Sequence, residues 1–159
     1  MTAWPTLHFS LSHTAGLAVC AFASAPVGAD VETLASVPGT ELVPLLHPAE
    51  QRAIRALPED RRPRAFLDCF VRKEAYLKGT GDGLWAELDS FAVGLGPSYP
   101  AAGPAAPSDL REAPPEHWGF AELDTPSTHG GSVALWMPEA RGAAPRVLAR
   151  RIDLTGTPS

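Results

Sequence analysis

The sequence lacks several features that would assign it to a specialised class of protein. It has only two cysteines, Cys20 and Cys69, without metal-ligand spacing, which predicts buried thiols rather than a disulfide framework. No window approaches the ~20 apolar residues of a membrane span, and no charged segment followed by an apolar run opens the chain. We therefore expect a cytoplasmic protein that does not enter a membrane.

Positive charge is missing from the first third of the chain. No Lys or Arg precedes Arg52, and the net charge is −5. A general nucleic-acid binder is therefore not expected, because phosphate backbones select basic surfaces. Basic residues then crowd one segment: Arg52, Arg55, Arg61, Arg62, Arg64, Arg72, Lys73 and Lys78. That segment predicts a contact surface for an acidic partner.

The residues that are present indicate one α+β domain. A chain of 159 residues, 45% hydrophobic and 19% charged, is enough for a single core. Apolar and alternating runs predict strands at 7–10, 17–22, 27–31, 90–95, 117–123, 132–137 and 147–152. The second and third of these are expected to form a hairpin. Helices are predicted at 49–57, ended by Pro58, and at 64–78, ended by Gly79, and a Pro/Gly/Ala-rich loop at 96–116.

The first candidate site is the run Gly28 to Glu32. On a strand, Asp30 and Glu32 point to the same face, because side chains alternate with period two. Two carboxylates on one face are the oxygen ligands that Mg²⁺ prefers. The alternative is an exposed acidic strand end without a ligand.

The second candidate site is on the longer predicted helix. Glu74 and Lys78 are four residues apart and share one helical face. Such a pair is also common on solvated helices, where it contributes only ~0.2–0.5 kcal/mol. The apolar neighbours Phe70 and Leu77 would dock this helix on a core and hold Glu74 in place.

The third candidate site is the run Phe9 to Thr14, a strand that passes into a polar turn. The hydroxyl of Ser12 and the imidazole of His13 could hold a phosphate there. The alternative is a histidine that caps the turn.

In order and content these three runs resemble the signature of Sfp-type 4'-phosphopantetheinyl transferases. That family has a Phe-x-Leu-Ser-His strand end, a Gly-x-Asp-x-Glu motif, and a helix with Lys-Glu-Ala, a further Lys and a glycine-rich exit. Here these are Phe9–His13, Gly28–Glu32 and Lys73–Lys78 followed by Gly79 to Leu84. Phe70 stands where tryptophan is frequent, Leu88 to Phe91 resembles the family's strand entry, and the resemblance covers residues 7–95. It implies the family's half-fold in a single domain, 1–159: a small antiparallel sheet packed against one long and one or two short helices.

The resemblance also implies the roles of individual residues. Asp30, Glu32 and Glu74 would bind Mg²⁺, and Glu74 would take the proton from the acceptor serine. Lys78, Ser12, His13 and Asp30 would contact coenzyme A, with Lys78 meeting a phosphate. Glu74 and Lys78 are thus the implied catalytic residues. The implied reaction moves 4'-phosphopantetheine from coenzyme A to a serine of an acyl or peptidyl carrier protein and releases 3',5'-ADP.

The chain departs from the family at its front. Full-length Sfp-type enzymes resemble two similar halves, of which the first supplies basic residues that grip coenzyme A, whereas residues 1–14 here look like a remnant of that half. The shorter holo-acyl-carrier-protein synthases begin close to their aspartate motif and lack the strand that ends in Ser-His. Three forms follow: a self-associating protein, a partner of a separately encoded front half, or an inactive remnant. A non-catalytic carrier-binding module and a metal-dependent phosphohydrolase are the alternative functions.

Overall fold

The chain begins with a β-hairpin. In the computed structural model, which describes residues 6–37, 39–81, 87–99, 115–140 and 143–150, β1 (His8–Thr14) pairs antiparallel with β2 (Leu17–Ala23). Gly16 allows the tight turn between them, because its φ of 75° is one that other residues adopt at a cost. Phe9 lies opposite Phe22 across the ladder. The strands predicted at 7–10 and 17–22 are confirmed, and each is longer than predicted.

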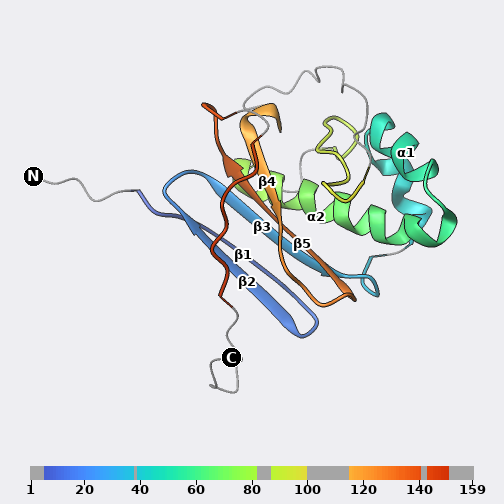
Figure 1. Cartoon of the computed structure of the whole chain (residues 1–159), viewed down its shortest axis with the longest axis horizontal. Helices are drawn as coiled ribbons and strands as arrows, with labels where there is room; N and C mark the ends of the chain where they lie inside the picture. The colour runs from blue at the N-terminus through green and yellow to red at the C-terminus, as the bar shows by residue number, and fades with distance from the viewer. Residues whose placement is uncertain (1–5, 38, 82–86, 100–114, 141–142, 151–159) are drawn as a thin grey trace, which may run out of the picture.

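A second, three-stranded sheet is formed by β3 (Val27–Thr33), β5 (His129–Trp136) and β4 (Trp118–Glu122) in the order β3-β5-β4. Both pairings are antiparallel, and Figure 1 shows the sheet beside the hairpin. The predicted strands at 27–31, 117–123 and 132–137 are thereby confirmed. The predicted hairpin of 17–22 with 27–31 is wrong, because the Trp136 N–H donates to the carbonyl of Pro26 and the chain there enters the other sheet.

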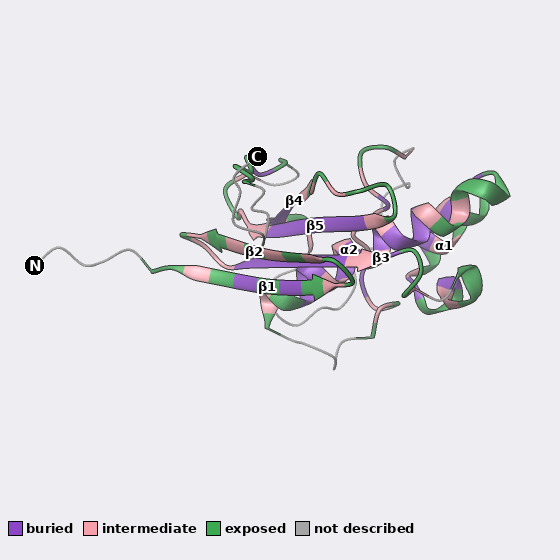
Figure 2. Ribbon diagram, turned by 90° about the horizontal axis from the view of Figure 1, so that it is seen from below, coloured by how far each residue is buried: buried purple, intermediate pink, exposed green. Residues whose placement is uncertain are grey.

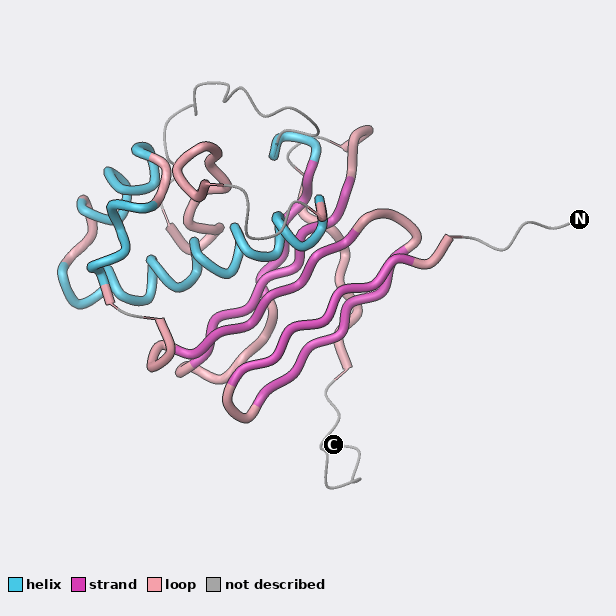
Figure 3. Tube along the Cα trace, turned by 180° about the vertical axis from the view of Figure 1, so that it is seen from behind, coloured by secondary structure: helices cyan, strands magenta, loops and turns pink. Residues whose placement is uncertain are grey.

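One long helix covers one face of the three-stranded sheet (Figures 1 and 3). The chain passes through η1 (Thr40–Leu45), α1 (Pro48–Arg55), which His47 and Glu50 cap, and η2 (Glu59–Arg61) into α2 (Arg62–Thr80). The predicted helices at 49–57 and 64–78 are confirmed. Helix α2 continues past Gly79 and ends at Thr80, with Gly81 as its C-cap, whose φ of 80° is left-handed. Among the described residues, no helix combines the length and the apolar character that crossing a membrane requires.

The buried side chains form two main clusters on α2. Ile54, Phe66 and Leu95 belong to the cluster between α1 and the first half of α2. Tyr76 and Trp118 belong to the cluster between the second half of α2 and the sheet, and their rings meet edge to face. Figure 2 shows burial concentrated where α2, β3 and β5 meet. Together with the two sheets, this arrangement confirms the predicted α+β class.

Two predicted strands are absent from the described residues. Residues 90–95, including the entry at Leu88 to Phe91, form a loop, because side chains rather than a neighbouring strand bind its backbone. The Glu50 carboxylate accepts the N–H groups of Val93 and Gly94, and Lys73 donates to the carbonyls of Leu88 and Phe91.

The C-terminal strand predicted at 147–152 is also wrong for its described part. Residues 147–150 have no ladder partner and pass over the face of the sheet opposite α2, while 151–152 lie outside the described residues. Of the predicted loop at 96–116, residues 97–98 form a turn and Pro115–His117 a 3-10 helix (η4). Its remaining central part, 100–114, also lies outside the described residues.

Hydroxyl groups join the hairpin to the three-stranded sheet. The Ser10 and Ser12 hydroxyls accept the N–H groups of Ala29 and Val31 at 3.0 and 3.2 Å. Both serines are buried, whereas the alternate residues Phe9 and Leu11 on the outer face are 70% and 60% exposed. The inward face of β1 is therefore polar, and it places Ser12 against β3.

Candidate active site

The position of Asp30 depends on an unusually close approach of β3 to α2. A Cβ built on Gly28 would lie 1.8 Å from the carbonyl oxygen of Ala75 and 2.5 Å from the nitrogen of Gly79, so only glycine fits at 28. Asp30 follows two residues later on the same strand face. The glycine contact therefore brings the Asp30 carboxylate against the last turns of α2, which carry Glu74 and Lys78.

Asp30 is 4% exposed, and only one of its two carboxylate oxygens has a hydrogen-bond partner. Its Oδ1 accepts hydrogen bonds from the Ser12 hydroxyl at 2.8 Å and the Lys78 ammonium at 2.7 Å. Its Oδ2 is buried without a hydrogen-bond partner. Burial raises the pKa of Asp30 above its usual value, although Lys78 and Ser12 oppose this shift. A buried anionic oxygen without a donor fits a bound cation.

Glu32 and Glu74 lie near this carboxylate from two sides. Glu32 Oε2 accepts the hydroxyls of Thr14 at 3.2 Å and Ser36 at 2.8 Å, which orient its side chain. The pKa of Glu74 is raised, first by burial and then by the negative charges of Asp30 and Glu32, with Lys78 lowering it. Asp30 and Glu74 thus both have raised pKa values, and the negative charge of Glu32 contributes to each, so this cluster of carboxylates has a deficit of positive charge.

The residues present thus fit a hard divalent cation in charge and in donor type. Among the described residues, however, no group of three or more His, Cys, Asp or Glu side chains is already gathered as a closed set of ligands. The Asp30 carboxylate is instead engaged by Lys78. Asp30, Glu32 and Glu74 as a common ligand set therefore stays a prediction.

Strand alternation separates the two residues predicted to hold phosphate together. Ser12 is buried and donates to Asp30, whereas His13, the next residue, is exposed on the outer face of the hairpin with Leu11. A single small group cannot contact both side chains from one side of β1. Ser12 belongs to the carboxylate site, and a contact of His13 with coenzyme A would have to come from the outer face.

An ion pair next to the site was not predicted from the sequence. Lys73 Nζ lies 2.8 Å from Glu50 Oε2, and neither side chain is exposed at all. Lys73 precedes Glu74 directly and also lies 4.1 Å from the centre of the Phe91 ring. The sequence contains a signal for this pair, because each residue lies on the apolar face of its helix. Glu50 shares the apolar stripe of α1 with Ile54, and Lys73 lies between Phe70 and Leu77 on the apolar stripe of α2.

The predicted basic surface is only partly formed: Lys73 is fully buried and Lys78 contacts Asp30, whereas the arginines at the other end of the segment lie far from the carboxylates. Arg64 and Lys78 are separated by 14 residues of α2, or about 21 Å along the helix. Arg64 donates to Asp68 and to the carbonyls of Ser127 and His129, so it holds the fold together. Arg52, Arg55 and Arg61 are exposed and form the part of the cluster that is accessible to a partner.

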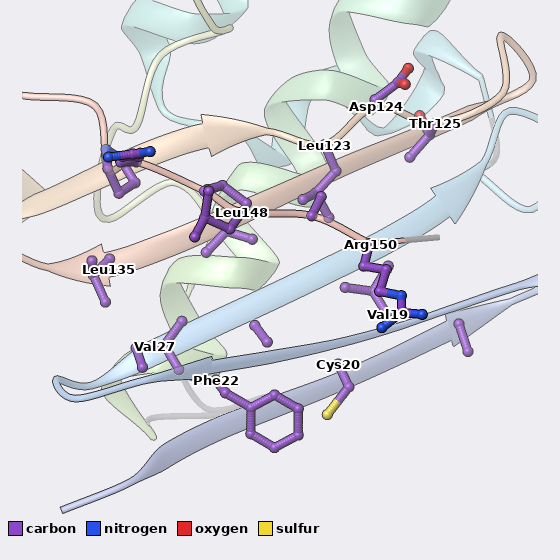
Figure 4. A pocket seen from close by; sticks show the side chains of 18 of the residues that line it. Val19, Cys20, Phe22, Val27, Leu123, Asp124, Thr125, Leu135, Leu148 and Arg150 are labelled. Carbon is purple, nitrogen blue, oxygen red and sulfur yellow. The ribbon is translucent and has the colours of Figure 1, made fainter. Parts of the chain in front are cut away.

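A groove of about 820 Å³ lies on the opposite face of the sheet, between β2 and the segment 145–150 (Figure 4). Apolar side chains such as Val19, Leu123 and Leu135 line it. None of the six predicted site residues contributes to its lining, so this groove is separate from the Asp30 site.

Comparison with known proteins shows the family to which the chain belongs. The sequence model of the "4'-phosphopantetheinyl transferase superfamily" matches residues 26–135, which span β3, α2 and both strands of the β4–β5 pair. The chain therefore belongs to the 4'-phosphopantetheinyl transferase superfamily, as its motifs predict.

Individual relatives match over different lengths. The chain is 33% identical to the 4'-phosphopantetheinyl transferase HetI of Nostoc sp. over 142 residues, which cover 84% of this chain and 55% of HetI. It is 32% identical to the 4'-phosphopantetheinyl transferase Sfp of Bacillus subtilis over 91 residues, 57% of this chain and 41% of Sfp. The holo-[acyl-carrier-protein] synthase structure of Thermotoga maritima aligns with a TM-score of 0.48 at 16% identity, covering 71% of this chain and 63% of that one. The chain spans about half the length of the curated relatives it matches.

Proposed function

We propose that this chain carries the carboxylate half of a 4'-phosphopantetheinyl transferase site. It would act with Mg²⁺ to move phosphopantetheine from coenzyme A to a serine of an acyl or peptidyl carrier protein, releasing 3',5'-ADP. The observation that supports this most is the meeting of Asp30, Glu74 and Lys78 where β3 crosses α2, with one Asp30 oxygen buried and without a partner.

Each side chain has a task that its surroundings support. Asp30, Glu32 and Glu74 would hold the metal ion, and a metal ion held there would neutralise negative charge on the pyrophosphate as its phosphoanhydride bond breaks and 3',5'-ADP leaves. Glu74 has a raised pKa and therefore suits a general base that accepts the serine proton near neutral pH. Lys78, whose side chain is 34% exposed, can turn toward a phosphate oxygen. Ser12 would keep Asp30 in place.

The proposed partners follow from charge and from the length of the relatives. An acidic carrier would contact Arg52, Arg55 and Arg61. Coenzyme A would need further basic residues, supplied by a second copy of the chain or by a separate front half. Both cysteines are free thiols, which fits the reducing cytoplasm; Cys69 is buried as predicted, whereas the prediction is wrong for Cys20, which is exposed.

The test measures the transfer of phosphopantetheine to a carrier protein. The chain, alone or joined to a front half, is incubated with coenzyme A, Mg²⁺ and an apo carrier protein, and intact-mass analysis measures the phosphopantetheine added to the carrier. Glu74→Gln should abolish the mass increase, because an amide neither binds the metal as an anion nor accepts the proton. Glu41→Gln, at an exposed position of η1, is the matched control and should transfer normally.

Two results would reject the proposal. One is that no form modifies any carrier; the other is that Glu74→Gln modifies it as fast as the parent. A non-catalytic carrier-binding module would bind the carrier and leave its mass unchanged. A phosphohydrolase would release nucleotide without any carrier present.

A further inference from the structure

Lys78 occupies the same carboxylate that the proposed function assigns to a metal ion. Its ammonium lies 2.7 Å from Asp30 Oδ1. Asp30 is 5% exposed at its side chain and Lys78 is 34% exposed. The carboxylate is therefore fixed, while the lysine reaches it from the solvent side on a flexible four-carbon stem.

A divalent cation and an ammonium ion at one carboxylate repel each other. Two positive charges a few ångströms apart repel each other even at the effective dielectric constant of ~20 that suits partly buried sites, and screening by solvent at the exposed Lys78 reduces this repulsion without removing it. The Ser12 bond to Asp30 is neutral and does not change this balance. Metal binding to the free protein must therefore either displace Lys78 or overcome its charge.

We propose that Lys78 is the resident counter-ion of Asp30 and makes binding of the metal and of coenzyme A mutually dependent. This inference rests on the proposed function, since it takes Asp30 as a metal ligand. A phosphate of coenzyme A draws the accessible ammonium of Lys78 away from Asp30, which frees the carboxylate for the cation. By linkage, the metal then strengthens coenzyme A binding by the same factor.

The surroundings of Asp30 favour such an exchange. The carboxylate stays oriented when Lys78 leaves, because Ser12 still donates to Oδ1, and Val31 N–H holds the Ser12 hydroxyl. Oδ2 is buried and has no donor to lose. Glu32 on β3 and Glu74 on α2 add negative charge near Asp30. Lys78 is thus the mobile cation of an otherwise fixed anionic site.

The experiment measures the affinity of the protein, in the form that the transfer assay uses, alone or joined to a front half, for Mn²⁺. The free ion is detected by electron paramagnetic resonance, with and without saturating coenzyme A. No carrier protein is added, so turnover plays no part. In the absence of coenzyme A, Lys78→Met should bind Mn²⁺ about tenfold more tightly than the parent. Coenzyme A should tighten Mn²⁺ binding in the parent and much less in Lys78→Met.

Two control variants isolate the local charge. Arg52→Met removes one positive charge from an exposed position of α1 and should bind Mn²⁺ like the parent. Lys78→Arg keeps the charge at the site and should keep the weak binding in the absence of coenzyme A. Circular dichroism verifies that each variant is folded.

The outcomes separate this inference from the proposed function. If Asp30→Asn removes Mn²⁺ binding but Lys78→Met binds no more tightly than the parent, the counter-ion role is wrong and the metal site stands. If Asp30→Asn binds Mn²⁺ like the parent, both the ligand assignment and the inference are wrong. Tighter binding by Lys78→Met that Arg52→Met reproduces would show an effect of net charge and would also overturn the inference.

Discussion

The buried ion pair of Glu50 and Lys73 gives the sharpest stability prediction. Replacing Lys73 by Met keeps the length of the side chain but leaves the Glu50 carboxylate, which has no exposed surface, without its cation. Breaking a buried pair by removing one partner costs about 3–5 kcal/mol. The substitution also removes the donors to the Leu88 and Phe91 carbonyls, so the upper part of that range applies.

Such a loss is a large fraction of the 5–15 kcal/mol that stabilises a typical domain. Urea unfolding followed by circular dichroism should show this loss as a much lower midpoint concentration of urea. The dependence of the unfolding free energy on urea should change little, because the surface exposed on unfolding is similar. The melting temperature should fall by roughly 10 °C. Arg52→Met, an equal change of charge on the exposed face of α1, should stay within about 0.5 kcal/mol of the parent.

The double variant Glu50→Gln/Lys73→Met tests whether the two side chains act as a pair. Its loss should be clearly smaller than the sum of the two single losses, because the second substitution removes the charge that the first left uncompensated. A Lys73→Met protein that loses less than about 1 kcal/mol, or single losses that simply add, would refute this reasoning. The role given to Glu50 in holding the loop after residue 90 would then fail as well.

Two further predictions concern the carboxylate site. Gly28→Ala should cost about 3 kcal/mol or more in urea unfolding and weaken Mn²⁺ binding, because the new Cβ would overlap the Ala75 carbonyl oxygen; an unchanged unfolding midpoint would contradict this. Glu74→Gln should stabilise the metal-free protein at pH 7, because a raised pKa means that the folded state disfavours the charged carboxylate. That gain should be absent below about pH 4, where the unfolded glutamate is itself protonated, and should grow as the pH rises; equal stability of Glu74→Gln and parent in EDTA across pH 4–8 would contradict it.

The sequence predicts the elements that local patterns determine. Helix α2 is read from its apolar spacing, and Asp30 and Glu32 share a strand face as period two requires. Pairing partners are set by distant residues, which explains why β3 joins β5 rather than β2. The loop at 90–95 has the composition of a strand, yet Glu50, 43 residues away, binds its backbone. The prediction that placed Lys73 in a basic contact surface overlooked its position on the apolar stripe of α2.

The spacing of residues in the sequence also explains only part of the predicted site. The approach of Lys78 to Asp30 depends on Gly28 fitting against α2, a contact between segments 47 residues or more apart in the chain. The separation of Ser12 from His13, by contrast, follows from alternation once the strand is extended to Thr14. The prediction ended the strand at Ser10 and so placed both residues in a turn, where they could have converged.

In strand β1 the polar side chains point toward the protein interior and the apolar side chains point outward. A slip of one residue against β3 would turn Phe9 and Leu11 inward, where each could gain about 1.5–3 kcal/mol from burial, and would carry Ser12 away from Asp30. The observed alignment leaves those side chains 70% and 60% exposed and keeps the hydroxyls on the Ala29 and Val31 amides. Strand β1 is therefore locally frustrated. The alignment that would bury Phe9 and Leu11 competes with the observed alignment, which places Ser12 on Asp30. A surface that covers Phe9 and Leu11 from outside removes that competition, and so stabilises the geometry at Asp30 without touching it.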